Sequence, residues 1–374
     1  MFYDEYLKLD RASMGKAVLS EELAKASGAV AREDLRFEDF LSLLAPAAAG
    51  LLDQMALRSR AITQKHFGKN IGMYIPLYLS NECTNECVYC GFNRNNDINR
   101  RTLTEHELDQ ELAAIKQQGY DSILLLTGEA PARVGLGTIA RCVTRARELF
   151  TQVSLEIYPM DTDGYKRLVD SGATGLTVYQ ETYNRETYSR VHRSGRKAHF
   201  QWRLEAPDRA ALAGFRKIGI GALLGLSDWR VDAAHVGAHA AYLMRKYWRT
   251  EVSVSFPRMR ECPSTFKPAC IVTDRELVQM MFALRLYLKS AGIALSTRES
   301  QGFRDNMIDL GVTSMSAGSK TNPGGYETYS KSESQGQFEI CDDRNTEQVV
   351  AAIRGKGYCP VFKDWSATFG GVRP

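Results

Sequence analysis

Three cysteines lie close together in the segment NECTNECVYC, at Cys83, Cys87 and Cys90. Cysteine thiolates select soft metals such as zinc, copper(I) and iron–sulfur clusters. A closed zinc site or an ordinary [4Fe–4S] cluster takes four protein ligands, and no fourth cysteine or histidine lies nearby. Three thiolates on a four-iron cluster would leave one iron open to an external ligand. The spacing therefore predicts an open metal centre, with a zinc site completed by a distant residue such as Cys142 as the alternative.

Eight short apolar runs form the frame around these cysteines. Several are almost continuous, such as ILLL at 123–126, which is typical of parallel strands covered on both faces. Helix-like stretches of about 10–18 residues separate the runs, and this alternation predicts a (β/α)8 TIM-type barrel. A six-stranded partial barrel is the alternative. The expected strands are Tyr74–Ser80, Ser122–Thr127, Val153–Tyr158, Gly175–Gln180, Gly219–Gly225, Val252–Pro257, Ile293–Arg298 and Val312–Ala317.

The cysteine motif follows directly on the first expected strand, which ends at Ser80. Barrel enzymes place their active sites at the carboxyl ends of the strands, so we expect the cysteines at that mouth. Glu156 lies inside the third expected strand, where a carboxylate is costly unless it has a partner. This carboxylate is therefore a candidate binding group for hydroxyls of a ligand.

Local signals mark several helix ends. The sequences TEHE at 104–107 and TDRE at 273–276 are typical of capping boxes at helix starts. Gly119, Gly172 and Gly292 each follow a helical run and fit the left-handed residue just past a helix end. We expect a helical N-terminal extension over residues 1–70, the barrel over 71–318, and an irregular segment over 319–374 that covers the barrel.

Composition restricts the class of protein. The chain has 374 residues, of which 44% are hydrophobic and 25% charged, and this is an ordinary globular composition. A net charge of +4 is too small for a dedicated nucleic-acid binder. No apolar run reaches the roughly 18 residues that cross a bilayer, and the start MFYDEYLKLD does not resemble a signal peptide. We therefore expect a cytoplasmic protein that binds neither nucleic acid nor membrane.

The motif resembles that of the radical S-adenosylmethionine (SAM) superfamily, which carries C-x3-C-x2-C after the first strand of its barrel. The sequence TGE at 127–129 is similar to the superfamily's Gly-Gly-Glu, with Thr127 in place of the first glycine. The resemblance implies that the three cysteines hold a [4Fe–4S] cluster whose open iron binds SAM. Cleavage of SAM then gives a 5′-deoxyadenosyl radical, and no protein base is assigned. The SAM-binding residues that it implies are Tyr89, Gly128, Glu129, Glu156, Gln180, Arg193, Lys197 and Gly221.

Longer stretches resemble the radical SAM aromatic amino acid lyases, and most of all the tyrosine lyases of thiamine thiazole biosynthesis. They include CGFNRNN, VYQETY, GIGALLGLSDWR, LSTRES and SAGSKTNPGGY, within roughly residues 35–365. This resemblance implies cleavage of the Cα–Cβ bond of L-tyrosine to 2-iminoacetate (dehydroglycine) and p-cresol, with SAM consumed to 5′-deoxyadenosine and methionine. It also implies thiazole synthase as a protein partner and flavodoxin or ferredoxin as electron donor.

Substrate-binding residues are expected at the strand ends. Arg298 ends the seventh expected strand, and its guanidinium could hold the carboxylate of an amino acid bidentately. An ordinary salt bridge is the alternative for this arginine. Tyr183 and Ser319 are the other candidates for substrate contact.

Two other functions remain compatible with the sequence. A related lyase acting on tryptophan and a non-catalytic iron–sulfur or zinc assembly factor are the alternatives. The hydrogenase-maturation relative carries an extension with a second cysteine cluster, and no C-x2-C pair occurs near Cys341 or Cys359, so CO and cyanide production is not expected. His235 and His239 are expected as satisfied surface or interface residues rather than metal ligands. The remaining cysteines are expected as small buried residues or surface thiols; they are Cys142, Cys262, Cys270, Cys341 and Cys359.

Overall fold

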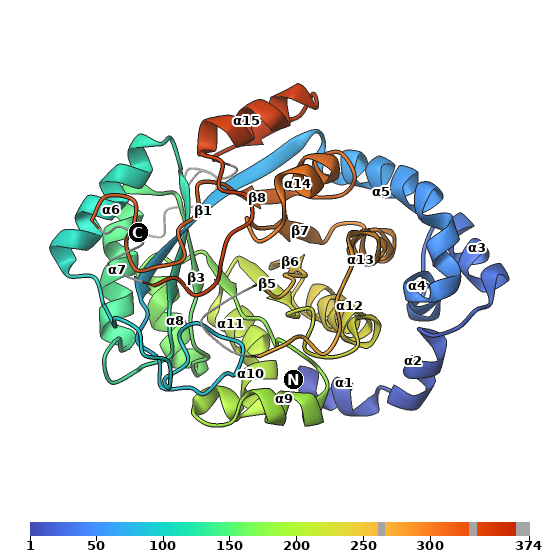
Figure 1. Ribbon diagram of the computed structural model, residues 1–374, viewed down its shortest axis with the longest axis horizontal. Coiled ribbons are helices and arrows are strands. Elements are labelled where there is room, and N and C mark those ends of the chain that lie inside the picture. Colours follow the sequence, from blue (N-terminus) through green and yellow to red (C-terminus); the bar gives the residue numbers. More distant parts are fainter. Residues whose placement is uncertain (261–265, 329–334, 364–374) are drawn as a thin grey trace.

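The computed structural model of the protein describes residues 1–260, 266–328 and 335–363. Its centre is a closed barrel of eight parallel strands (Figure 1). Neighbouring strands pair in chain order from β2 to β8, and the long strand β1 closes the ring because it pairs with both β8 and β2. This confirms the expected (β/α)8 barrel and excludes the six-stranded alternative. The strands are β1 Asn70–Ser80, β2 Ser122–Thr127, β3 Gln152–Glu156, β4 Gly175–Thr177, β5 Lys217–Gly221, β6 Glu251–Ser255, β7 Gly292–Leu295 and β8 Ser314–Ser316.

All eight expected strands are confirmed, although most end earlier than expected. The run Gly175–Gln180, for example, leaves the sheet after Thr177. A ninth strand, β9 Cys359–Val361, was not expected; it pairs in parallel with the first residues of β1, outside the ring. Its three residues carry no alternation of apolar and polar side chains that a sequence pattern could detect.

Helices surround the barrel in Figure 1, and α1–α5 cover one side of it. Both expected capping boxes are confirmed, at Thr104 and Thr273. Gly119 and Gly172 have positive φ angles as expected, but Gly292 begins β7 instead, where an added Cβ would meet Ser253. The helices are α1 Phe2–Lys8, α2 Arg11–Ala17, α3 Leu23–Ala31, α4 Phe37–Leu44, η1 Pro46–Leu51, α5 Leu52–Phe67, α6 Glu105–Gln117, α7 Leu136–Leu149, α8 Thr162–Asp170, α9 Arg185–Val191, η2 Arg196–Ala198, α10 Phe200–Leu204, α11 Ala206–Ala213, α12 Trp229–Lys246, α13 Asp274–Tyr287, α14 Gln301–Met307 and α15 Thr346–Gly355.

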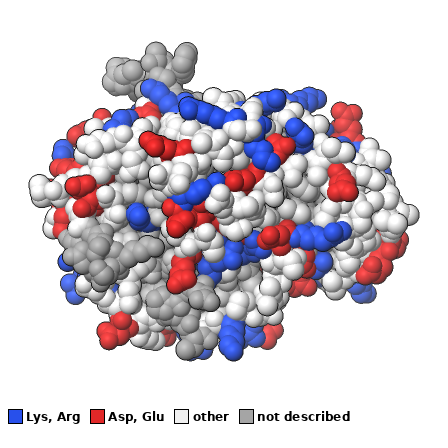
Figure 2. Space-filling view, turned by 45° about the horizontal axis from the view of Figure 1, so that its top comes forward, with Lys and Arg blue, Asp and Glu red and all other residues white. Residues whose placement is uncertain are grey.

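The distribution of surface charge and the apolar character of the helices can be compared with the expectations drawn from composition. Figure 2 shows Lys and Arg intermingled with Asp and Glu on the face that it presents, as the small net charge suggests. Within the described residues, no single helix is long and apolar enough to span a membrane. One pair, α4 with the stretch from η1 through α5, passes that test by length and composition but is bent by 81°.

The N-terminal helix α1 is attached to the barrel through two buried histidines of α12. The Phe2 ring stacks on His239 with centroids 3.8 Å apart, and His239 Nδ1 lies 2.9 Å from the Tyr183 hydroxyl. The His235 ring also stacks on the Tyr183 ring, with centroids 5.5 Å apart. Both histidines are 1% exposed, so of the two expected positions, surface or interface, the surface is excluded. Burial lowers the pKa of His235 to about 4 and that of His239 to about 3.

These buried histidines predict loss of stability in mild acid. They are neutral in the folded protein, whereas in the unfolded chain they bind protons below about pH 6.5. The unfolded state therefore gains protons as the pH falls from about 6.5 towards 4, and the folded state loses about 1.4 kcal/mol per histidine per pH unit in this window. We expect the melting temperature of His239→Gln to change less between pH 7 and 5.5 than that of the wild type. An equal change in both proteins would contradict this assignment.

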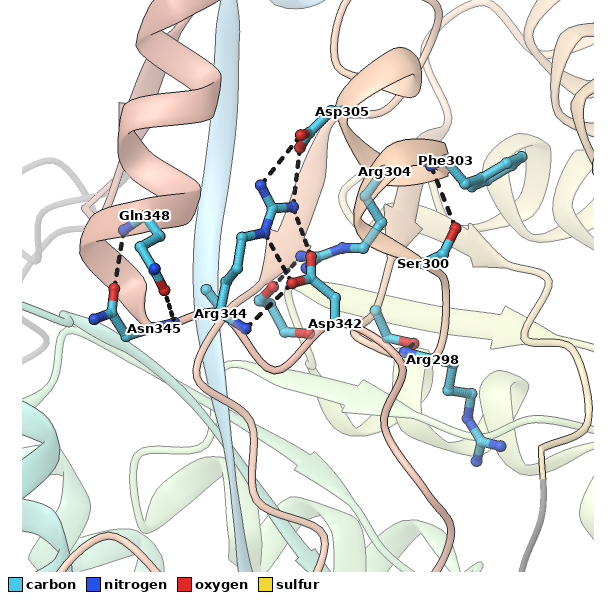
Figure 3. A network of polar contacts seen from close by, with 12 residues as sticks. Arg298, Ser300, Phe303, Arg304, Asp305, Asp342, Arg344, Asn345 and Gln348 are labelled. Atoms are coloured by element: carbon cyan, nitrogen blue, oxygen red, sulfur yellow. Dashed lines mark hydrogen bonds and ion pairs between the residues drawn. The ribbon is translucent and has the colours of Figure 1, made fainter.

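A second buried network fixes the C-terminal segment to α14 (Figure 3). Arg304 and Asp342 form an ion pair in which both side chains are 0% exposed. Arg344 adds two contacts to Asp342, at 2.7 and 2.8 Å, and reaches Asp305 at 2.9 Å. The backbone N–H groups of residues 341 and 342 both donate to the carbonyl of Thr297, the residue before Arg298. The network thus fixes the backbone at the end of β7.

Removing Asp342 should destabilise the protein strongly. The Asp342→Ala variant would leave the buried Arg304 guanidinium unpaired, and breaking a buried pair in this way costs about 3–5 kcal/mol. Urea denaturation followed by circular dichroism measures the change. The matched control is Asp170→Ala, which removes an exposed pair with Lys166 and should cost less than about 1 kcal/mol. Equal losses in the two variants would show that the network contributes no more than a surface pair.

Candidate functional site

The cysteine motif forms a loop directly after β1, at the mouth where the carboxyl ends of the strands meet. Backbone hydrogen bonds fasten this loop to its neighbours: Thr84 N–H donates to the Glu129 carbonyl after β2, at 2.9 Å. Val88 N–H donates to the carbonyl of Val191 at 3.0 Å, at the end of α9. The loop is thus held from two sides, and it lies at the mouth where we expected the cysteines.

The surroundings of the cysteines suit a metal-bound thiolate. Burial raises the pKa of the Cys87 thiol, and it raises that of Cys90 to about 11, so neither would ionise readily without a positive partner. Amide N–H donors lie at two sulfur atoms: Asn85 Nδ2 is 3.7 Å from Cys83 Sγ, and Gln337 Nε2 is 3.7 Å from Cys90 Sγ. Bonds of this kind to sulfur tune iron–sulfur centres, so the donor set fits a cluster.

Among the described residues, no three His, Cys, Asp or Glu side chains are arranged to hold one metal ion. The three motif thiols are nevertheless close enough for their charges to interact, since besides burial Cys90 and Cys83 both raise the pKa of Cys87. In a [4Fe–4S] cube each thiolate binds a different iron, so its ligands need not converge as those of a single zinc ion must. The residues present fit a cluster better than a closed mononuclear site.

A pocket opens beside Cys90 at the barrel mouth. Its wall combines charged and aromatic side chains, as binding sites for small molecules do. The predicted residues in its wall come from the motif loop, from β3, from η2 and from the segment just after β7; they are Tyr89, Cys90, Glu156, Lys197 and Arg298. The structure thus brings together residues up to about 200 positions apart in sequence.

Two charged groups in this pocket have no polar partner. Within the described residues, the Glu156 carboxylate accepts no hydrogen bond, and burial together with the negative charge of Glu181 raises its pKa to about 7. The Arg298 guanidinium makes no hydrogen bond or ion pair in the same part of the chain; it lies 3.3 Å from the centroid of the Phe338 ring. Figure 3 shows its side chain pointing away from the Asp342 network. Unpaired groups of opposite charge facing one cavity are suited to a zwitterionic or polar ligand.

A largely buried ion pair also lines this pocket. Lys197 Nζ is 2.6 Å from Glu181 Oε1, and although burial and Arg203 lower the pKa of Lys197, Glu181 raises it above its ordinary value. Glu181 is the non-glycine residue with a positive φ, 73°, among the described residues. Such backbone strain persists where the surroundings enforce it and is common at functional sites.

Tyr89 is held in the pocket wall by its hydroxyl, which lies 2.7 Å from His192 Nε2. Glu129 and Gly128 lie against the motif loop rather than in the pocket wall. The Glu129 carboxylate is buried and accepts a hydrogen bond from Asn85 Nδ2 at 2.8 Å. Gly128 approaches the loop so closely that an added Cβ would lie 2.3 Å from the Glu82 carbonyl oxygen. Both residues therefore hold the loop in place.

Besides Gly128 and Glu129, five residues predicted to bind SAM or substrate are not brought into this pocket. Arg193 is exposed, so of the two cations considered there the structure brings in Lys197 alone. Gln180 is buried and donates weakly to the Phe200 carbonyl, and Tyr183 bonds to His239 behind the barrel wall. The Cα of Gly221 faces the Ser255 carbonyl and the Tyr179 ring. Ser319 is buried, and its hydroxyl has no partner among the described residues.

Several wall residues were not predicted: Tyr179, Glu181, Leu223, Pro257, Met259, Arg260, Gln337 and Phe338. Glu181 lies in VYQETY, one of the stretches that resemble the lyase family, whereas Gln337 and Phe338 lie in a Gly- and Ser-rich stretch without a periodic pattern. Their place depends on tertiary contacts that local sequence does not reveal.

The other cysteines lie away from the motif. Cys142 and Cys270 are half-buried, and Cys341 and Cys359 are exposed, while Cys262 lies outside the described residues. The seven cysteines that the structure describes are free thiols.

Comparison with known proteins gives consistent matches. Residues 77–235 match the radical SAM superfamily, and residues 255–359 match the biotin and thiamin synthesis associated domain. The 2-iminoacetate synthase of Escherichia coli is 43% identical over 371 residues, which cover 99% of this chain and 98% of the relative. That of Salmonella typhimurium is 40% identical over the same length and coverage. The solved structure of the FeFe-hydrogenase maturase HydG from Carboxydothermus hydrogenoformans is similar with a TM-score of 0.83 and 33% identity, covering 98% of this chain and 83% of that one.

Proposed function

The chain belongs to the 2-iminoacetate synthase family of the radical SAM superfamily, and from this premise we propose how its pocket serves the family's reaction. The protein is a carbon–carbon lyase that cleaves the Cα–Cβ bond of L-tyrosine to 2-iminoacetate and p-cresol. Its cofactors are a [4Fe–4S] cluster and SAM, which together supply a 5′-deoxyadenosyl radical that abstracts hydrogen. The described residues bind, orient and shield the reactants.

In this proposal Cys83, Cys87 and Cys90 hold three corners of the cluster. Tyr89 and Lys197 face the space beside Cys90, and Glu156 offers its unpaired carboxylate to the ribose hydroxyls of SAM. Gly128 and Glu129 support the motif loop from the end of β2, through the close approach and the hydrogen bond described above. These assignments are supported by the position of all these residues at the same mouth of the barrel.

The single observation that carries the substrate assignment is the unpaired guanidinium of Arg298 in the pocket that also contains Cys90. Phe338 covers one face of the guanidinium and leaves its N–H edge for a carboxylate. Two parallel N–H···O bonds would fix the amino acid in one orientation, and this sets which hydrogen faces the radical. Ser319 remains a proposed contact because its buried hydroxyl has no partner among the described residues.

The partners follow from the chemistry of the product and of the cluster. An imine hydrolyses in water, so a direct transfer to thiazole synthase would protect it. The cluster needs one electron per SAM cleaved, which flavodoxin or ferredoxin would supply. We propose a cytoplasmic location, since reducing conditions keep cysteines such as these as free thiols.

An anaerobic assay tests this proposal. Protein reconstituted with iron and sulfide is mixed with SAM, dithionite and either tyrosine or tryptophan, and the products are separated by chromatography. Tyrosine should give 5′-deoxyadenosine, p-cresol and glyoxylate, the last from hydrolysis of 2-iminoacetate. Turnover of tryptophan alone would redirect the substrate assignment, and intact SAM with a cluster that still accepts an electron would support the non-catalytic alternative.

A further inference from the structure

Gln337 joins the C-terminal segment to the cysteine loop through its main chain. Its carbonyl accepts a hydrogen bond from Gly91 N–H at 3.1 Å, and its own N–H donates to the Thr321 carbonyl at 2.9 Å. The approach is close, because a Cβ added at Gly91 would lie 2.5 Å from the Gln337 oxygen. These contacts fix the segment directly beside Cys90.

The side chain of Gln337 completes the contact with the loop. Its Nε2 lies 3.7 Å from Cys90 Sγ, and its Oε1 accepts a hydrogen bond from the Tyr78 hydroxyl at 2.8 Å. A thiolate can only accept, so the amide nitrogen must face the sulfur and the amide oxygen must face Tyr78. Tyr78, Gln337 and Cys90 thus form a chain of hydrogen bonds that ends on the sulfur.

We propose that Gln337 is a positioning residue that donates an N–H···S hydrogen bond to the Cys90 thiolate and thereby raises the reduction potential of the cluster. The reduced cluster carries one more negative charge than the oxidised one, and part of that charge lies on its sulfur ligands. A donor at a ligand sulfur therefore stabilises the reduced form more than the oxidised form. This inference rests on the proposed function, since it needs the cluster at these cysteines.

The test is a redox titration of reconstituted protein, in which the reduced cluster is counted by its electron paramagnetic resonance signal. Gln337→Met keeps the length of the side chain and removes the N–H donor. At the wild-type midpoint, the ratio of reduced to oxidised cluster should fall about threefold to tenfold, the equivalent of one lost hydrogen bond. The matched control is Thr321→Val, which removes the bond from Thr321 Oγ1 to the Phe338 carbonyl in the same segment and touches no cysteine. Its midpoint should equal that of the wild type.

Two further variants keep the inference testable if Gln337→Met does not fold or does not retain iron. Gln337→Glu keeps an oxygen that accepts from Tyr78 but loses the N–H donor, so it should also lower the reduction potential of the cluster. Tyr78→Phe keeps the Gln337 amide and removes only the hydroxyl that orients it, so it should lower the potential less. An unchanged midpoint in whichever of the three holds a full cluster would overturn the role of Gln337 and leave the lyase assignment intact. A wild-type protein that assembles no [4Fe–4S] cluster would overturn both.

Discussion

Replacing Cys90 by alanine should abolish both SAM cleavage and p-cresol formation. Cys90 lies in the wall of the pocket that also contains Glu156 and Arg298, and it is one of the three thiols available to the cluster. With two thiolates left, the loop after β1 cannot hold three corners of a four-iron cluster. Iron and sulfide analysis after anaerobic reconstitution should show a large loss of both, and 5′-deoxyadenosine should fall to background.

Cys142→Ala is the control for this experiment. Cys142 is a half-buried thiol on α7, away from the motif loop, so its loss removes a cysteine without touching the proposed site. Full iron content and wild-type 5′-deoxyadenosine formation are expected. A Cys90→Ala variant that keeps its cluster, or a Cys142→Ala variant that loses it, would show that the ligands have been assigned to the wrong residues.

Replacing Arg298 by alanine should reduce kcat/KM for tyrosine by at least about a hundredfold, because two charge-assisted hydrogen bonds worth about 1.5–3 kcal/mol each disappear. Iron content should stay unchanged, since no hydrogen bond joins the Arg298 side chain to a cysteine among the described residues. Cleavage of SAM without substrate should also persist. Steady-state formation of p-cresol against tyrosine concentration measures the effect.

Two comparisons sharpen the Arg298 experiment. Arg298→Lys keeps the charge but loses the planar fork, so it should fall between alanine and wild type. Arg141→Ala removes an arginine that is 64% exposed on α7, and its activity should remain at the wild-type level. If Arg298→Ala turns tyrosine over at a rate within about twofold of the wild type, Arg298 makes no bidentate contact with the substrate. The tyrosine carboxylate then binds elsewhere.

Much of the fold could be predicted because its strands are locally distinct. Runs such as ILLL at 123–126 are apolar on both faces, and β2 occupies the expected residues Ser122–Thr127. Capping boxes at Thr104 and Thr273 also act within one helical turn, so sequence alone reveals them. In contrast, β9 consists of Cys359, Pro360 and Val361, and it depends on pairing with a strand almost 290 residues away. No local sequence pattern predicts such a strand.

The site shows the same difference between features with a local sequence signal and features that depend on long-range contacts. Arg298 could be expected at the barrel mouth because it ends an expected strand, and Glu156 stood out because a carboxylate inside an apolar strand is costly without a partner; both line the pocket. Tyr183 also stands near a strand end, yet it turns to the far side and bonds to His239, because packing against α1 and α12 decides its direction. Gln337 was missed because its contacts with Cys90 and Tyr78 span about 250 residues. The direction of a side chain and its long-range contacts depend on tertiary packing, which the local pattern of a single sequence does not predict.

The most direct test is an anaerobic crystal structure of the reconstituted protein with SAM and tyrosine bound. We predict a [4Fe–4S] cluster on Cys83, Cys87 and Cys90, with SAM on the fourth iron and the tyrosine carboxylate on the guanidinium of Arg298. A zinc ion at the cysteines, or a fourth iron capped by a protein side chain, would contradict the account.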